Sequence, residues 1–200
     1  NDFEGNLYSF NRGRHGNKIP MDRETFRQKL RDFVLSGWDA SILNPYYRLP
    51  QKLYTTHFII PLVPSTMAPD GFGAPDVESY YFMVHYKGQL VSKEPITFRF
   101  WGIGDAFLMV NVNGDEVFLA CNETHKKYFD WREGTFAGGE KYYLGNKRMW
   151  IGDWITLEAG EPLPMQIMFG EWLGGSLSAM LNVEVQGEEY PRNRQGGPIL

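Results

Sequence analysis

Aromatic side chains in or beside the expected loops offer the clearest chemistry in this sequence. Flat rings pack on the apolar faces of sugars, while neighbouring carboxylates or amides bind the hydroxyls. Trp172 follows Glu171, and Trp131 follows Asp130. These aromatic positions are Trp131, Tyr142, Tyr143, Trp150 and Trp172. A tryptophan in a β domain is more often part of the core, so each position also has that interpretation.

Residues that could carry catalysis lack the spacings that catalysis requires. The four histidines are scattered, without the H-x-x-x-H spacing of a zinc site. No Gly-x-Ser-x-Gly elbow is present. The pair Gly102 and Gly104 lacks the third glycine and the helix of a dinucleotide fingerprint. Carboxylates for glycoside hydrolysis can come from distant positions, but no local pattern indicates them. We therefore expect neither an enzyme nor a metal site.

The composition is that of a packed globular chain. Of the 200 residues, 42% are hydrophobic, 16% aromatic and 22% charged, and the net charge is −4. A negative chain without a long Lys/Arg block does not attract phosphate backbones, so we expect no nucleic-acid partner. The charge is uneven, because residues 1–52 hold 9 basic and 6 acidic side chains and the remainder holds 11 basic and 18 acidic.

The printed residues contain no recognisable membrane span or signal peptide. No apolar stretch approaches the roughly 20 residues that cross a bilayer, and no signal-peptide pattern is found at the start. The sequence begins at Asn1 rather than at Met. We interpret this start as that of a processed or truncated chain, and our hypothesis is that a signal or a membrane anchor preceded it.

One amphipathic helix is expected near the start of the chain. Asp22 suits the N-cap, and Gly37 provides the stop. The apolar positions that share one helix face are Phe26, Leu30, Phe33 and Val34. Charged residues cover the other side, so the helix should pack on the domain rather than on a membrane.

From residue 53 the apolar pattern changes to a period of two, which is typical of strands. Asn113-Gly114 predicts a type I′ hairpin, and Cys121 is expected to be a buried structural thiol. The predicted strands cover residues 7–10, 54–63, 80–90, 96–101, 107–112, 116–121, 153–157, 165–169 and 177–185. Long irregular segments are expected at 64–75 and 124–148. The pattern predicts a mostly β fold, an antiparallel sandwich or barrel with one N-terminal amphipathic helix.

The length supports one domain over two small ones. We expect a single domain over residues 1–200. Residues 1–52 are predicted to form a helix-containing extension packed on it, and residues 192–200 an exit strand or linker.

Segments of the second half resemble the PA14 family in their order and spacing. The stretch 96–114, ITFRFWGIGDAFLMVNVNG, places an aromatic strand before a Gly/Asp turn, an apolar strand and an Asn-Gly hairpin. The stretch 155–167, ITLEAGEPLPMQI, is similar to the family's turn of leucine, a small residue, glycine and proline. The stretch 174–181, GGSLSAML, is similar to its Gly-rich loop before the last strand. Together with 85–88, these segments span about half of the chain.

The resemblance implies a β-sandwich or barrel that binds ligands, most often carbohydrates. Calcium-dependent lectin members carry two adjacent aspartates after the aromatic strand, where this chain has Asp105-Ala106. Losing one carboxylate removes a ligand that a hard cation would want. We therefore expect Asp105 to accept backbone N–H groups of the turn. We expect no cofactor, and Asp105-Ala106 disfavours calcium without removing it as an alternative.

Two functions follow from these observations. The first is a non-catalytic carbohydrate-binding or adhesive module of an exported protein, with Trp131, Trp172, Glu171, Asp105 and Tyr142 as ligand-binding candidates. The second is a structural or protein-interaction domain of a larger cell-envelope protein that has lost the lectin site. The expected partner is a glycan in the first case and an envelope protein in the second, and the expected location is periplasmic, surface or extracellular.

Overall fold

The computed structural model describes residues 3–130, 143–144, 147–194 and 196–200. Its strands are β1 (Phe3–Gly13), β2 (Tyr46–Arg48), β3 (Leu53–Thr55), β4 (Ile59–Pro64), β5 (Phe82–Leu90), β6 (Ile96–Asp105), β7 (Phe107–Val112), β8 (Asp115–Cys121), β9 (Tyr143–Leu144), β10 (Lys147–Arg148), β11 (Trp150–Ile151), β12 (Ile155–Leu157), β13 (Leu163–Glu171) and β14 (Ser176–Val185). Its helices are α1 (Arg23–Leu35) and α2 (Ala68–Gly71), with 3-10 turns η1 (Ala40–Leu43), η2 (Ser65–Met67) and η3 (Glu123–Tyr128).

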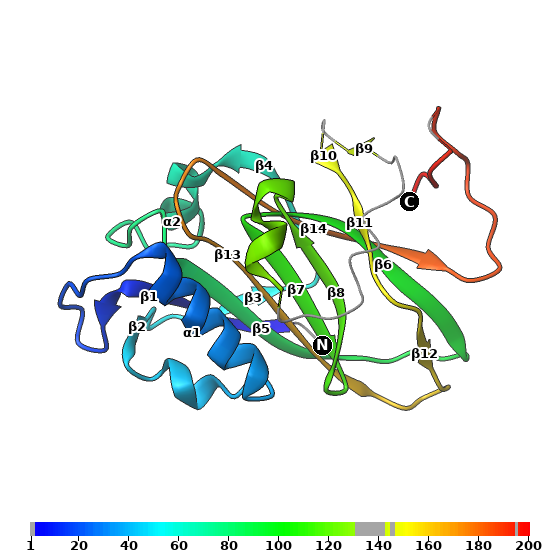
Figure 1. Ribbon diagram of the computed structural model, residues 1–200. Helices are drawn as coiled ribbons and strands as arrows, with labels where there is room; N and C mark the ends of the chain where they lie inside the picture. The colour runs from blue at the N-terminus through cyan, green and yellow to red at the C-terminus, as the bar shows by residue number, and fades with distance from the viewer. Residues whose placement is uncertain (1–2, 131–142, 145–146, 195) are drawn as a thin grey trace.

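Two antiparallel sheets form the body of the described chain (Figure 1). The seven-stranded sheet has the order β2-β1-β5-β13-β7-β8, with β3 also paired to β1. The five-stranded sheet has the order β11-β6-β14-β4, with β12 also paired to β6. Strands β6 and β7 follow each other in sequence but lie in different sheets. The fold is therefore the predicted β-sandwich.

Helix α1 covers the outer face of the seven-stranded sheet (Figure 1). The Asp22 carboxylate accepts the Thr25 N–H at 2.8 Å, which caps the first turn. The Phe26 ring lies 4.9 Å from that of Phe10 on β1, and the Phe33 ring lies 5.0 Å from that of His85 on β5. The apolar face predicted from the sequence is the buried one.

The centre of the seven-stranded sheet is thus buried on both faces. Its other face packs on the five-stranded sheet, where the rings of Phe100 and Phe118 lie 6.4 Å apart. As a result every residue of β7 is buried, and its sequence is apolar throughout except for Asn111 rather than alternating. His85 lies on the helix-covered face of this sheet and is 1% exposed. Its Nε2 lies 2.8 Å from the Gln166 side-chain oxygen.

The Asn-Gly hairpin is confirmed, since Asn113 and Gly114 have φ of 54° and 96° between β7 and β8. The single predicted strand 54–63 is wrong. It divides into β3, which pairs with β1, and β4, which pairs with β14 in the other sheet. His57 lies exposed between the two and not inside a strand. The segment 64–75, expected to be irregular, includes the short turns η2 and α2.

Both ends of the chain contribute to the packed structure. Residues 1–52 supply β1 and β2 to the seven-stranded sheet in addition to α1. Near the other end, Arg192 and Pro198 form an isolated antiparallel bridge, and Leu200 packs against a small cluster that includes Trp101.

Among the described residues, no helix combines the length and the apolar character that a bilayer crossing demands.

Candidate functional site

Two of the predicted ligand-binding residues meet where the two sheets join. Asp105 ends β6 in one sheet, and Glu171 ends β13 in the other. The Ala106 N–H donates to the Gly170 carbonyl at 3.1 Å, which ties the connection after β6 to the end of β13. Asp105 is 7% exposed and Glu171 is 2% exposed. We call Asp105 and Glu171 the acidic pair.

Glu171 binds the backbone of the turn that follows it. Its Oε1 accepts the N–H groups of Trp172, Leu173 and Gly174 at 3.0 to 3.1 Å. Its Oε2 is buried and makes no hydrogen bond in the described part of the chain. Burial raises the pKa of Glu171 to about 7, and the negative charge of Asp105 adds to the increase against the opposing effect of the three N–H groups. The Glu171 carboxyl group therefore titrates near neutral pH.

The side chain of Trp172 belongs to the core. It is 0% exposed and stacks on Phe129 with the ring centroids 5.6 Å apart. The rings of His125 and Tyr128 approach it edge-on at 4.6 and 5.3 Å. A sugar platform needs an open ring face, and Trp172 offers none in this arrangement. The interpretation of Trp172 as a core residue is the one that its burial supports.

The other aromatic candidates are either outside the described residues or buried. Trp131 and Tyr142 lie outside the described residues, so their ligand-binding roles stay predictions. Trp150 is buried, 4% exposed, and the Lys126 ammonium lies 6.0 Å from its ring centroid. The structure thus brings Asp105, Glu171 and Trp172 together at one end of β13.

The position next to Asp105, where lectins of the family carry a second carboxylate, is occupied by alanine in this chain. The Ala106 methyl group is fully buried beside Asp105, where the resemblance implies a second carboxylate. The peptide bond between these two residues is cis. Within the described ranges, no group of three or more His, Cys, Asp or Glu side chains is placed to hold a metal. Glu171 is a carboxylate that accepts several turn N–H groups, and the same role at Asp105 stays a prediction.

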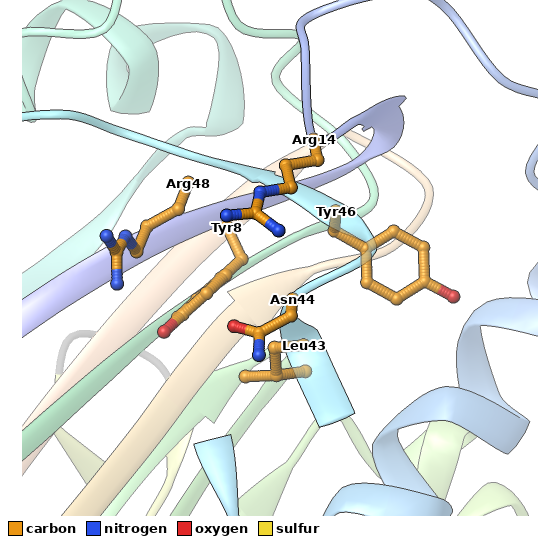
Figure 2. Close-up of a pocket in the computed structure, with 6 residues that line it drawn as sticks. All are labelled: Tyr8, Arg14, Leu43, Asn44, Tyr46 and Arg48. Atoms are coloured by element: carbon orange, nitrogen blue, oxygen red, sulfur yellow. The ribbon is translucent and has the colours of Figure 1, made fainter. Parts of the chain in front are cut away.

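A second region, on the helix-covered side of β1, was not predicted from the sequence. A pocket of about 170 Å³ is lined by Tyr8, Arg14, Leu43, Asn44, Tyr46 and Arg48, and we call it the arginine pocket (Figure 2). Figure 2 shows its two guanidinium groups on either side of the Tyr8 side chain. The available signals were the excess of basic residues in 1–52 and the alternation of Tyr46 and Arg48, which places both on one face of β2.

No family model matches the sequence, and no curated protein matches it. Solved structures do match its fold. The PA14 sugar-binding domain from an RTX adhesin is 14% identical, covers 95% of this chain and 93% of that chain, and has a TM-score of 0.50. The epithelial adhesin 6 A domain from Candida glabrata, solved in complex with Galb1-3GlcNAc, is 15% identical with coverages of 100% and 92% and a TM-score of 0.52.

The PA14 domain of the antifreeze protein MpAFP is 12% identical, with coverages of 92% and 82% and a TM-score of 0.50. The order and pairing of the strands, together with these matches, define the fold of this chain as the PA14 fold. The resemblance inferred from residues 85–185 is thereby confirmed at the level of the fold.

Proposed function

We propose that this domain is a non-catalytic carbohydrate-binding or adhesive module of an exported protein. The observation that carries the proposal is the match, over nearly the full length of both chains, to adhesin domains described as sugar-binding or solved with a bound disaccharide. Fold alone does not fix function, so the proposal also uses the chemistry of the described residues. Carboxyl groups, guanidinium groups and tyrosine hydroxyls are all able to hydrogen-bond sugar hydroxyls.

The acidic pair marks the first place where a glycan would bind. Asp105, at 7% exposed, is proposed to offer a carboxyl oxygen to the glycan, whereas Glu171, at 2% exposed, is proposed to hold the turn 172–174 in place. Trp131 and Tyr142 are proposed to supply the aromatic contacts. Because Ala106 replaces a carboxylate, we further propose that this binding does not depend on calcium.

The test is a glycan-array screen of the purified domain in calcium and again in chelator. We expect saturable binding under both conditions and a loss of binding in Trp131→Ala. Trp154→Ala is the matched control, because Trp154 is an exposed tryptophan, at 42%, that follows β11. Binding abolished by chelator would overturn calcium independence. A blank array at high protein concentration would overturn sugar binding.

The alternative, a protein-interaction domain, is favoured by exposed apolar side chains on and beside the edge strand β4. Ile59, Leu62 and Met67 are 59%, 39% and 57% exposed, and β4 pairs with β14 alone among the described strands. Exposed apolar side chains gathered at a sheet edge are typical of a partner surface. Binding to a cell-envelope protein, lost in Leu62→Asp while the array stays blank, would select this function.

A further inference from the structure

The arginine pocket holds two positive charges without a carboxylate among its lining residues. Within the described residues, neither Arg14 nor Arg48 forms an ion pair. The nearby Arg12 differs, because its Nε lies 3.0 Å from the Glu78 carboxylate. Two guanidinium groups that share a pocket repel each other, and a bound anion would relieve this repulsion.

Backbone pairing fixes the positions of the lining groups. Tyr8 and Arg48 are direct cross-strand partners of β1 and β2, so their side chains lie next to each other on one face. Tyr46 lies two residues before Arg48 and shares that face. The Arg14 N–H donates to the Pro45 carbonyl at 2.8 Å, which holds the turn after β1 against the start of β2. The pocket is therefore formed by the fold itself.

The neutral groups of the pocket suit a ligand that carries hydroxyls. Burial raises the pKa of Tyr8 and of Tyr46, so both phenols keep their O–H at physiological pH. The ring of Tyr46 rests against Phe10 with the centroids 4.4 Å apart, which fixes its orientation. Asn44 adds an amide that both donates and accepts hydrogen bonds. Hydroxyl recognition and anion recognition are thus available at one place.

An acidic side chain outside the pocket does not neutralise it. Asp32 on α1 raises the pKa of Tyr46 through its negative charge. Its carboxylate is already engaged by the Gln28 amide at 2.8 Å and by the Lys29 ammonium at 3.6 Å. The positive charge at the pocket therefore remains available to a ligand.

We propose that the arginine pocket binds one acidic sugar residue of a glycan, with its carboxylate or sulfate held between Arg14 and Arg48 and its hydroxyls bound by Asn44 and Tyr8. The inference rests on the proposed glycan binding and adds the charge of the ligand and a second place of contact. Planar guanidinium groups bind oxyanions with two hydrogen bonds each. A volume of about 170 Å³ is below the roughly 300 Å³ of pockets for larger ligands, which suits a single monosaccharide.

The experiment is a titration of the purified domain with glucuronate, glucose, a sulfated glucose and inorganic sulfate, followed by calorimetry or by NMR shifts. We expect saturable binding of glucuronate or of the sulfated sugar that weakens at least tenfold in Arg14→Gln and in Arg48→Gln. Arg194→Gln is the matched control, since Arg194 is exposed in the C-terminal segment, away from the pocket lining. Added salt should weaken the binding of the acidic sugar, because the two guanidinium groups are near the surface.

The ligand series separates the possible outcomes. Preference for glucuronate over sulfated glucose, or the reverse, identifies the oxyanion. Sulfate ion bound as tightly as the acidic sugars would overturn the sugar assignment. Equal affinity for glucose and glucuronate, or unchanged binding in folded Arg14→Gln and Arg48→Gln, would overturn the whole inference.

The array and the folding of the variants complete the test. Neutral glycans bound on the array without an acidic preference would leave the proposed function standing and overturn this inference. Asn44→Ala, with a thermal melt of every variant, keeps the test decisive should an arginine variant fold poorly. A folded Asn44→Ala that binds the acidic sugar as tightly as the parent would overturn the role of the amide in hydroxyl binding.

Discussion

The acidic pair and the arginine pocket each bring two like charges together, but they differ in depth. Asp105 and Glu171 are 7% and 2% exposed and lie where the two sheets join. Arg14 and Arg48 are exposed and line a pocket beside the helix-covered face of β1. In the first region the protein surrounds the charges, whereas in the second water does.

This difference determines how each region responds to its like charges. A buried carboxyl group avoids its charge by keeping a proton, as the raised pKa of Glu171 shows. A guanidinium group keeps its charge at any physiological pH and relies on water or on a bound anion. The acidic pair is thereby coupled to the stability of the fold, while the arginine pocket is left free to respond to ligands.

The largest expected effect tests the core beneath the acidic pair. Trp172→Ala should lower the free energy of unfolding by about 3–5 kcal/mol, because it removes a fully buried ring that stacks on Phe129. Trp154→Ala should cost about 1 kcal/mol, since that ring is 42% exposed and its described ring contact is the Arg99 guanidinium 4.5 Å from its centroid. Urea unfolding measures both.

A Trp172→Ala domain with native stability and no glycan binding would contradict the core assignment. It would show that Trp172 contacts the ligand in solution, as the sequence alone allows. Equal losses in both variants would show that burial does not separate these two tryptophans.

The next effect is a dependence of stability on pH. The pKa of Glu171 is raised in the fold to about 7 from an ordinary value of 4.5, so its contribution is fully present below 4.5 and is lost as the pH rises through 7. Glu171→Gln should remove this loss. Between pH 5 and pH 8, the difference in unfolding free energy between parent and variant should change by about 2–3 kcal/mol in favour of the variant.

The comparison with Glu171→Gln cancels the contributions of other groups. Burial lowers the pKa of His85 to about 4, so its contribution has the opposite sign and is lost as the pH falls from 6.5 towards 4. The His85 contribution is the same in the parent and in Glu171→Gln, so it cancels in the difference between them. Glu189→Gln, at an exposed position, should leave the pH profile unchanged, and a parallel profile for Glu171→Gln would disprove the assignment.

Much of the architecture could be predicted because it depends on local patterns. The N-cap at Asp22, the period of α1 and the Asn113-Gly114 turn each need only a few consecutive residues, and each is seen. The strand 54–63 was predicted wrongly because residues 56–58, Thr-His-Phe, contain no Gly or Pro to mark a break between two strands. The change of sheet there depends on pairing with β1 and β14, which are distant in sequence.

The candidate sites were harder to predict because they are assembled by tertiary contacts. Asp105 and Glu171 were named individually, but their proximity follows from the junction of β6 with β13. Trp172 stands next to a Gly-rich turn, which resembles an exposed loop, yet Phe129 and η3 cover it. The arginine pocket combines β1, η1 and β2, and its pairing of Tyr8 with Arg48 spans 40 positions of sequence.

The smallest expected effect tests whether the arginine pocket is dispensable for folding. Arg14→Gln should change the free energy of unfolding by no more than about 0.5 kcal/mol, because exposed side chains contribute little. The change should be towards higher stability at low salt and should vanish at high salt, since one of two like charges is removed and salt screens their repulsion. A loss above about 1 kcal/mol would mean that Arg14 supports the turn after β1. A neutral or stabilising change together with a tenfold loss of acidic-sugar binding would assign Arg14 to ligand recognition. The proximity of the Arg14 and Arg48 charges would then be explained by the anion they bind, because it does not stabilise the fold.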